Sequence, residues 1–192
     1  FGRSYGEKIS GTIIKDGKPI ILHNVREAIK NKLAYVTEDR KGNGLVLTNP
    51  IKINTTLANL NSISKNGVID KDKEYQVAVE YKEKLRTKCP SVEQNVGNLS
   101  GGNQQKVLLA KWMFTDPDVL ILDEPTRGID VGTKVDIQKL VLKLASEGMS
   151  ITFISSETDE MLRTCSRLIV MRDRKVVGEL KGDDLNQKMI MN

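Results

Sequence analysis

Short apolar runs that alternate with an amphipathic segment limit the folds open to the second half of this chain. Val119–Leu122 is a continuous apolar stretch, typical of a strand buried on both faces of a parallel sheet, and Ile151–Ile154 is expected to be a second buried strand. Between them, Thr133–Ser146 carries apolar residues at helical spacing, and Gly148 can end that helix. A strand, a helix and a second strand in succession predict an α/β fold with a mainly parallel sheet and right-handed crossovers.

The start of the chain adds a hairpin and a third strand. Ile9–Ile14 and Pro19–Leu22 flank Asp16-Gly17, a pair that favours a tight turn between antiparallel strands. A short surface helix over Val25–Lys32 and a strand over Leu33–Val36 follow. We expect the hairpin to lie at an edge of the sheet.

After the second buried strand, the sequence predicts one more helix and a strand pair. The helix begins over Thr158–Leu162. Leu168–Met171 and Val176–Leu180 are apolar enough for two strands, with a turn over Arg172–Lys175.

The middle of the chain changes from strand-like to helical periodicity. A polar loop at Asn66-Gly67 interrupts this part, and a helix over Ser100–Phe114 ends it. We expect two lobes, with residues 1–45 and 116–192 in an α/β core and residues 46–115 in a helical subdomain. Apolar residues recur at helical spacing before Cys89-Pro90 at Ile53, Leu57, Leu60, Val77, Tyr81 and Leu85.

Composition argues against several classes of function. Aromatic residues make up 4% of the chain, too few for a platform on which nucleic-acid bases stack, and the net charge of +5 is spread along the sequence. A single histidine, His23, argues against a histidine metal site and against a Ser-His-Asp triad. Cys89 and Cys165 show no paired spacing and are interpreted as free thiols in a reducing compartment. No apolar run approaches the ~18 residues of a membrane span.

A serine and two glycines open the helix over 100–114. Ser100 is a good N-cap, and Gly101 and Gly102 leave room for a ligand to approach the backbone. The N–H groups and positive dipole at a helix start favour a phosphate. An ordinary glycine turn that caps a helix is the alternative, and this motif alone does not decide between them.

Two adjacent carboxylates follow the strand over 119–122. Ligands of parallel α/β sheets bind at the carboxyl ends of the strands, where Asp123 and Glu124 lie. The first could hold Mg²⁺, and the second could orient or deprotonate an attacking water. A structural role as an acidic helix cap is common for one carboxylate and less common for two.

Together these motifs resemble the ABC ATPases. Asn98–Asp130 contains a signature-like LSGGNQQ, a Walker B-like strand ending in Asp-Glu-Pro-Thr, and a D-loop-like segment, in the family's order. YVTEDRKGNGL at Tyr35–Leu45, EPTRGIDVG at Glu124–Gly132 and ISSE at Ile154–Glu157 narrow the resemblance. With these segments, the chain most resembles the second half of the fused double ATPases that serve importers of monosaccharides such as ribose, galactose and xylose.

The resemblance implies a P-loop NTPase-like fold and a peripheral position on the cytoplasmic face of the cell membrane. It implies a second ATPase half on the same polypeptide, permease subunits in the membrane, and a sugar-binding protein that acts indirectly. ATP and Mg²⁺ are the implied cofactors, and nucleic acid is not an expected partner. The sugar stays open, since the ATPase does not touch it.

The resemblance assigns roles to the residues of this chain that match the ABC ATPase motifs. The catalytic carboxylate is Glu124, and the metal-associated carboxylate is Asp123. The resemblance implies that the signature turn and the D-loop contact nucleotide. The turn contains Ser100, Gly101, Gly102, Asn103 and Gln104, and the D-loop residue is Asp130.

Two positions depart from the wider family. Glu38 replaces the loop glutamine that senses Mg²⁺, and Ser156 replaces the histidine near the γ-phosphate. Glu38 could still accept a hydrogen bond from metal-bound water, but a serine cannot act as an imidazolium. We also expect Ser156 to cap a helix.

These departures leave two hypotheses. The first is a half that hydrolyses ATP, and the second is a regulatory half that completes its partner's site without hydrolysing. A soluble ABC ATPase of translation or DNA repair is a third possibility, but no coiled-coil insertion or basic arm is present.

A P-loop, GxxxxGK[ST], is absent from the sequence. Because the motif should precede the first hairpin, we expect this chain to be the later part of a longer ATPase. We expect the piece alone to show little ATPase activity and weak nucleotide binding.

Overall fold

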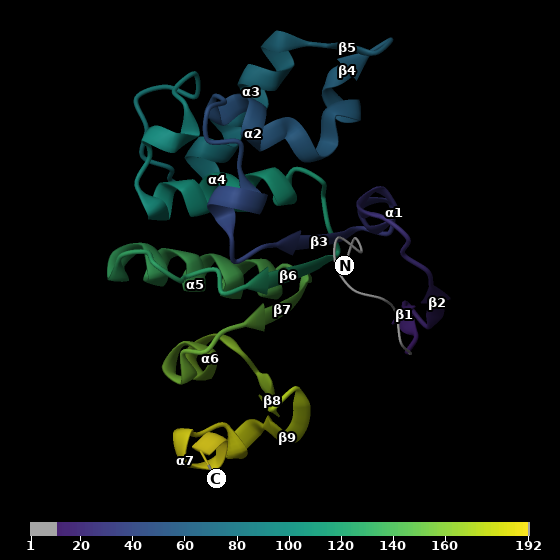
Figure 1. The fold of residues 1–192 in the computed structure, drawn as a ribbon, viewed down its shortest axis with the longest axis vertical. Helices are drawn as coiled ribbons and strands as arrows, with labels where there is room; N and C mark the ends of the chain where they lie inside the picture. Colours follow the sequence, from purple (N-terminus) through teal and green to yellow (C-terminus); the bar gives the residue numbers. More distant parts are fainter. Residues whose placement is uncertain (1–10, 192) are drawn as a thin grey trace.

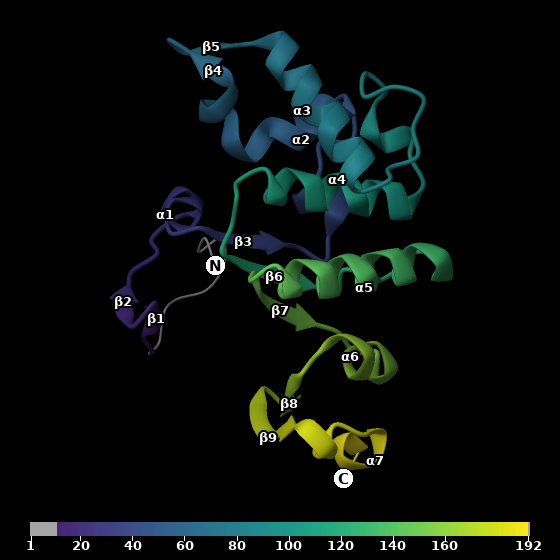
Figure 2. The same ribbon diagram turned by 180° about the vertical axis from the view of Figure 1, so that it is seen from behind.

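The structure is a computed structural model that describes residues 11–191. A small sheet lies at its centre, with a helical region on one side and a strand pair near the C-terminus on the other (Figure 1). The opposite view shows helices α4 (Gly101–Met113) and α5 (Val131–Ser146) running beside the sheet (Figure 2). No helix within residues 11–191 has the length and apolar character needed to cross a membrane.

Three parallel strands form the central sheet, in the order β3-β6-β7. They are β3 (Leu33–Val36), β6 (Val119–Asp123) and β7 (Ser150–Ile154). Each strand covers one of the apolar runs of the sequence, and Leu120 and Leu122 of β6 are 0% exposed. The predicted parallel sheet is therefore confirmed. Because β6 lies in the middle, its carboxyl end lies between those of β3 and β7.

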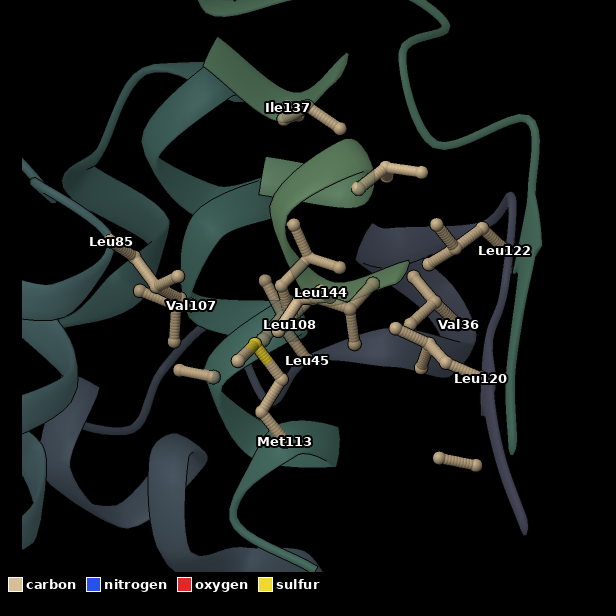
Figure 3. Packing of buried hydrophobic residues seen from close by; sticks show 14 of the residues in the cluster. Val36, Leu45, Leu85, Val107, Leu108, Met113, Leu120, Leu122, Ile137 and Leu144 are labelled. Atoms are coloured by element: carbon tan, nitrogen blue, oxygen red, sulfur yellow. The ribbon is translucent and has the colours of Figure 1, made fainter. Parts of the chain in front are cut away.

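Helices α4 and α5 cover the sheet. Leu108 of α4 and Leu144 of α5 pack toward Val36 and Leu120 of the strands (Figure 3). The predicted helices agree closely with these two, although α5 begins two residues earlier than Thr133. Glu147 is the C-cap residue of α5, and Gly148 follows with a left-handed φ of 100°.

The segment between β3 and β6 is mainly helical, as expected. It begins with a π-helical turn over Arg40–Gly44, α2 (Ile51–Thr56) and a 3-10 stretch over Leu57–Ile63. After α3 (Lys71–Lys84) and a short 3-10 turn over Val96–Asn98, the chain enters α4.

The polar loop expected at Asn66-Gly67 is a hairpin. Strands β4 (Ser64–Lys65) and β5 (Val68–Ile69) pair antiparallel, and the two turn residues have φ of 54° and 80°. Strands of two residues are too short to show an alternating pattern, but the Asn-Gly pair is itself a hairpin signal.

One hydrophobic core joins the two regions expected to be separate lobes. Buried side chains from α2, α3 and α4 and from the central sheet belong to the same cluster. Helix α4 packs against both α2 and β3, so it is shared by both regions. The boundaries at residues 45 and 116 stay a prediction.

The hairpins at the two ends do not extend the central sheet within residues 11–191. Strands β1 (Ile13–Lys15) and β2 (Lys18–Ile20) pair with each other, as do β8 (Arg167–Arg172) and β9 (Lys175–Lys181). The predicted hairpins and turns are confirmed, but the first hairpin is not hydrogen-bonded to the edge of the central sheet within the described residues. Residues 9–10 of its expected first strand lie outside the described part.

Three short helices complete the fold. Helix α1 (Val25–Lys30) is capped by Asn24, whose side chain accepts a hydrogen bond from the Glu27 N–H. Helix α6 (Thr158–Thr164) follows β7. A 3-10 turn over Gly182–Asp184 and α7 (Gln187–Met191) end the described chain.

Candidate functional site

Asp123 ends the central strand with a partly exposed carboxylate. Its Oδ2 accepts a hydrogen bond of 2.6 Å from the Tyr35 hydroxyl of the neighbouring strand β3. No lysine or arginine of the described chain forms an ion pair with Asp123 or Glu124. Both carboxylates thus lie at the strand's carboxyl end without a cation that would neutralise them.

Tyr35 stays a hydrogen-bond donor over the whole neutral range. Burial, and then the hydrogen bond and charge of Asp123, raise the pKa of Tyr35 to about 12. A phenol that keeps its proton fixes one oxygen of Asp123 and leaves the orientation of the carboxylate defined.

Glu124 adopts a backbone conformation that is unusual for its residue type. Its φ is +43°, in the left-handed region where non-glycine residues are disfavoured. Its N–H still donates to the Ile154 carbonyl at 2.9 Å, so the ladder between β6 and β7 continues to this residue. Such a conformation costs about 1–3 kcal/mol and is often found at functional sites.

The bend at Glu124 brings its carboxylate to the loop after β7. Glu124 Oε1 accepts a hydrogen bond of 2.8 Å from the main-chain N–H of Ser156. Two loops that follow adjacent parallel strands are therefore joined through the carboxylate expected to be catalytic.

Ser156 contributes a main-chain group to this contact. The side chain is exposed, and its hydroxyl makes no hydrogen bond within the described part of the chain. The expected helix cap is wrong, because Glu157 is the N-cap residue of α6 and Ser155 accepts from the Glu157 N–H at 3.1 Å. The helix begins one residue later than a Ser156 cap would require.

A buried carboxyl group lies beneath these loops. Glu160 of α6 is 3% exposed, and its Oε2 accepts from the Thr126 hydroxyl at 2.7 Å and the Ser155 hydroxyl at 2.9 Å. Its Oε1 accepts from the Gln138 amide at 3.1 Å. Glu160 therefore connects the loop after β6, helix α5 and the loop after β7.

The start of α4 is ordered by its own cap. Ser100 Oγ accepts from the Asn103 N–H at 3.5 Å and from the Asn103 side-chain amide at 3.0 Å. Asn103 Oδ1 in turn accepts from the Lys88 N–H at 2.9 Å. Ser100 is exposed and Asn103 partly exposed, so this turn faces solvent.

Close packing accounts for the two glycines of the turn. A Cβ on Gly101 would lie 2.9 Å from Arg40 Nη2, and one on Gly102 would lie 2.6 Å from Thr133 Oγ1. Ligand approach is the reason that we expect from the sequence for both glycines. The structure adds a second reason within the chain: the start of α4 lies close to Arg40 at Gly101 and to Thr133 of α5 at Gly102.

Gln104 faces inward, contrary to the expectation that it contacts nucleotide. The residue is 4% exposed, and its side-chain amide donates to the carbonyls of Val96, Gly97 and Leu99 at 3.2–3.5 Å. Its N–H donates to the Ser100 carbonyl at 2.9 Å. Gln104 holds the loop that precedes the turn, because its position in the first helical turns points it to the core.

Asp130 caps α5 beside this turn. Its carboxylate accepts from the Thr133 N–H at 2.9 Å and from the Thr133 hydroxyl at 2.8 Å. These hydrogen bonds, the first of them foremost, hold the pKa of Asp130 below its ordinary value. Thr133 is the same residue that approaches Gly102, so the cap and the turn share one contact.

Arg40 ties the loop after β3 to the segment that leads to Asp130. Its guanidinium donates to the carbonyl of Arg127 at 3.0 Å and to that of Gly128 at 3.4 Å. Glu38 forms an ion pair with the Arg127 side chain. The expected contact of Glu38 with a metal-bound water would require that pair to open. A surface pocket of about 350 Å³ is lined by Glu38, Asp39, Arg40, Lys41 and Arg127.

The donor set suits a hydrated magnesium ion better than a fully protein-bound metal. No group of three or more metal-ligating side chains gathers within residues 11–191. Mg²⁺ usually keeps several waters and binds through one or two carboxylates together with substrate phosphates. A partly exposed Asp123 with one oxygen fixed by Tyr35 fits that pattern.

Three residues that shape the site, Tyr35, Arg40 and Glu160, were not predicted from the sequence. Tyr35 could have been noted as a polar aromatic near the carboxyl end of the strand that pairs with β6. Arg40 is one charged residue in a charged loop, and its contact with two carbonyls depends on tertiary structure. In the sequence, Glu160 is typical of a surface residue on a short helix, and its neighbours do not predict that it is buried.

Curated proteins similar to this chain are ATP-binding proteins of sugar importers. The chain is 50% identical over 191 residues to the L-arabinose transport ATP-binding protein of Geobacillus stearothermophilus. It is 45% identical over 191 residues to the xylose import ATP-binding protein of Geobacillus kaustophilus. Both alignments cover 100% of this chain, which spans 37% and 38% of those relatives' length.

Solved structures support the same fold. A nucleotide-free ATP-binding cassette from an ABC transporter matches 96% of this chain, and the chain covers 74% of it, with a TM-score of 0.80 and 19% identity. A dimeric cassette bound to ADP and Pi matches 90% of this chain, and the chain covers 74% of it, with a TM-score of 0.75 and 21% identity. The family model described as ABC transporter matches residues 4–127. This chain therefore belongs to the ABC transporter family, with a P-loop NTPase-like α/β fold.

Proposed function

We propose that this chain is part of an ATP-hydrolysing subunit of a sugar importer, and that Glu124 is its catalytic carboxylate. The observation that carries the proposal is the contact between Glu124 Oε1 and the Ser156 N–H at the carboxyl end of β6. It holds an unneutralised carboxylate in one place at the sheet edge where α/β proteins bind ligands. The names of the relatives, which concern arabinose and xylose transport, support the importer.

In this proposal Glu124 orients a water molecule and accepts its proton as the water attacks the γ-phosphate. The Ser156 N–H occupies one carboxylate oxygen, which leaves the other directed at the water. A general base of this kind accelerates a reaction by about 10²–10⁴-fold when it is well placed. The strained backbone of Glu124 is part of that placement.

Asp123 would hold Mg²⁺ through the oxygen that Tyr35 does not fix, with nucleotide phosphates completing the coordination. The ion would neutralise charge on the phosphates of ATP during hydrolysis. Glu38 would join this site only after releasing Arg127.

The turn over Ser100–Asn103 and the D-loop residue Asp130 would serve a nucleotide held by another ATPase half. Ser100 is exposed at the start of a 13-residue helix, where N–H groups and the helix dipole favour phosphate. The contact of Gly102 with Thr133 would make the turn and the D-loop move as one surface. We propose that the second half lies on the same polypeptide, that membrane permease subunits bind both, and that a sugar-binding protein feeds the permease.

A regulatory half that completes its partner's site without hydrolysing is the second candidate. The exposed Ser156 favours it, since the hydroxyl cannot supply the charge of an imidazolium near the phosphate. The ion pair between Glu38 and Arg127 favours it too.

ATP turnover by the full-length polypeptide separates the two candidates. Glu124→Gln in this half alone should lower turnover substantially, whereas Asp159→Asn, an exposed position on α6, should not. Unchanged turnover in the Glu124→Gln variant would support the regulatory half. Because the sequence has no GxxxxGK[ST] motif, we also propose that the isolated chain binds Mg·ATP weakly and does not turn it over.

A further inference from the structure

We infer that Glu160 is a positioning residue for hydrolysis, which sets the place of the Ser156 N–H that holds Glu124. The inference rests on the proposed role of Glu124 and names a residue that acts on it from a distance. Glu160 itself is buried, and its carboxyl group accepts hydrogen bonds from Thr126, Gln138 and Ser155 and not from Glu124 or Ser156. Its influence would pass through Ser155, the residue before Ser156.

The surroundings of Glu160 make it a junction between three parts of the fold. Its carboxyl group accepts from Thr126 in the loop after Glu124, from Gln138 in α5, and from Ser155 in the loop after β7. Thr126 is 1% exposed, so this hydrogen bond has no competition from solvent. Both loops that carry the Glu124–Ser156 contact are therefore attached to one carboxyl group.

The Ser155 hydroxyl is held from two directions. It donates to Glu160 Oε2 at 2.9 Å and accepts from the Glu157 N–H at 3.1 Å. Ser156 lies between these two fixed residues, and its own side chain has no hydrogen bond in the described chain. The direction of the Ser156 N–H thus depends on the Ser155–Glu157 turn and, through it, on Glu160.

A buried carboxyl group without a cation needs an explanation beyond packing. No described lysine or arginine forms an ion pair with Glu160. Three hydrogen-bond donors from three elements define positions that apolar contacts would leave looser. A displacement of about 1 Å at a reacting group costs up to about 10²-fold in rate.

The test uses the full-length polypeptide with the other half's own catalytic carboxylate replaced, so that hydrolysis reports this half. Glu160→Ala should lower the single-turnover rate of the folded protein by about 10-fold or more and change ATP affinity by less than about 2-fold. Glu160→Gln keeps the length and an acceptor oxygen, and should restore most of the rate. Asp159→Asn, exposed and adjacent, is the matched control and should behave as the parent protein.

The Glu124→Gln background separates this inference from the proposed function. If Glu160 acts through Glu124, Glu160→Ala should add little to the loss already caused by Glu124→Gln. Equal and independent losses from the two changes would overturn the inference. So would a folded Glu160→Ala protein whose rate and affinity both match the parent's. If Glu124→Gln itself has no effect, the proposed function fails, whatever Glu160 does.

Discussion

The carboxyl end of β6 and the start of α4 hold their polar groups in different ways. At the first, Tyr35 and the Ser156 N–H reach Asp123 and Glu124 from neighbouring strands and loops. At the second, Ser100 caps its own helix, and two glycines admit close contacts from Arg40 and Thr133. The first arrangement depends on hydrogen bonds between distant segments. The second depends on close packing, which the absence of side chains at Gly101 and Gly102 allows.

The difference suggests different tasks for the two regions. Donors that fix single oxygens orient a carboxylate, which is what proton transfer requires. A tightly packed helix start keeps the positive end of the helix dipole in one place, which suits an anion brought by another molecule. The two regions should therefore respond differently to substitution.

The largest effect on stability is expected at the glycine that touches Thr133. Gly102→Ala places a Cβ 2.6 Å from Thr133 Oγ1, and the β-branched threonine has little freedom to move away. We expect a loss of about 2 kcal/mol in the free energy of unfolding, measured by urea denaturation. Gly178→Ala is the control, because no heavy atom lies within 4 Å of its added Cβ. Similar stability in both variants would contradict the claim that close packing against Thr133 requires glycine at position 102.

A smaller effect is expected from the hydrogen bond to Asp123. Tyr35→Phe removes the hydroxyl that donates to Asp123 Oδ2, and should cost about 1 kcal/mol because the pair is partly exposed. Tyr75→Phe is the control, since Tyr75 is 44% exposed. A cost no larger than that of Tyr75→Phe would show that the hydroxyl does not fix Asp123.

The same tyrosine has a pH signature with a definite sign. Its folded pKa of about 12 lies above the ordinary tyrosine value of 10.0, so the unfolded chain ionises first as pH rises. The contribution of Tyr35 to stability is complete below pH 10 and is lost between about pH 10 and 12. Tyr35→Phe should therefore flatten the decline of stability across that window.

The smallest effect is expected at the cap of α5. The pKa of Asp130 lies below its ordinary value of 3.8 because of its hydrogen bonds to Thr133. Its contribution to stability is present above that ordinary value and disappears as pH falls through the lower, folded pKa. Asp130→Asn keeps a cap oxygen but cannot titrate, so the urea midpoint should depend less on pH in the acid range. If the urea midpoint of Asp130→Asn depended on acid pH as strongly as that of Asp159→Asn, the contribution of the Asp130 cap would be ruled out.

Local pattern predicted the elements of this fold and missed contacts between them. The apolar runs at β3, β6 and β7 and the cap at Ser100 were visible because they depend on neighbours in sequence. Arg40 and Glu160 were missed because their partners lie 87 and 34 residues away, at Arg127 and Thr126. The sequence points to the Ser156 side chain, whereas the main-chain N–H of Ser156 makes the contact with Glu124. Every residue except proline has such an N–H group, so the residue type does not predict this contact.

The division of labour between Asp123 and Glu124 is the central claim, and the nucleotide left on the protein tests it directly. The full-length polypeptide, with the other half disabled, is incubated with Mg·ATP, and the bound nucleotide is identified. Glu124→Gln should retain unhydrolysed ATP, because the magnesium carboxylate is intact and hydrolysis is slowed by about 10²-fold or more. Asp123→Asn should retain little nucleotide of either kind. ADP on the Glu124→Gln protein, formed as fast as on the parent, would contradict the account.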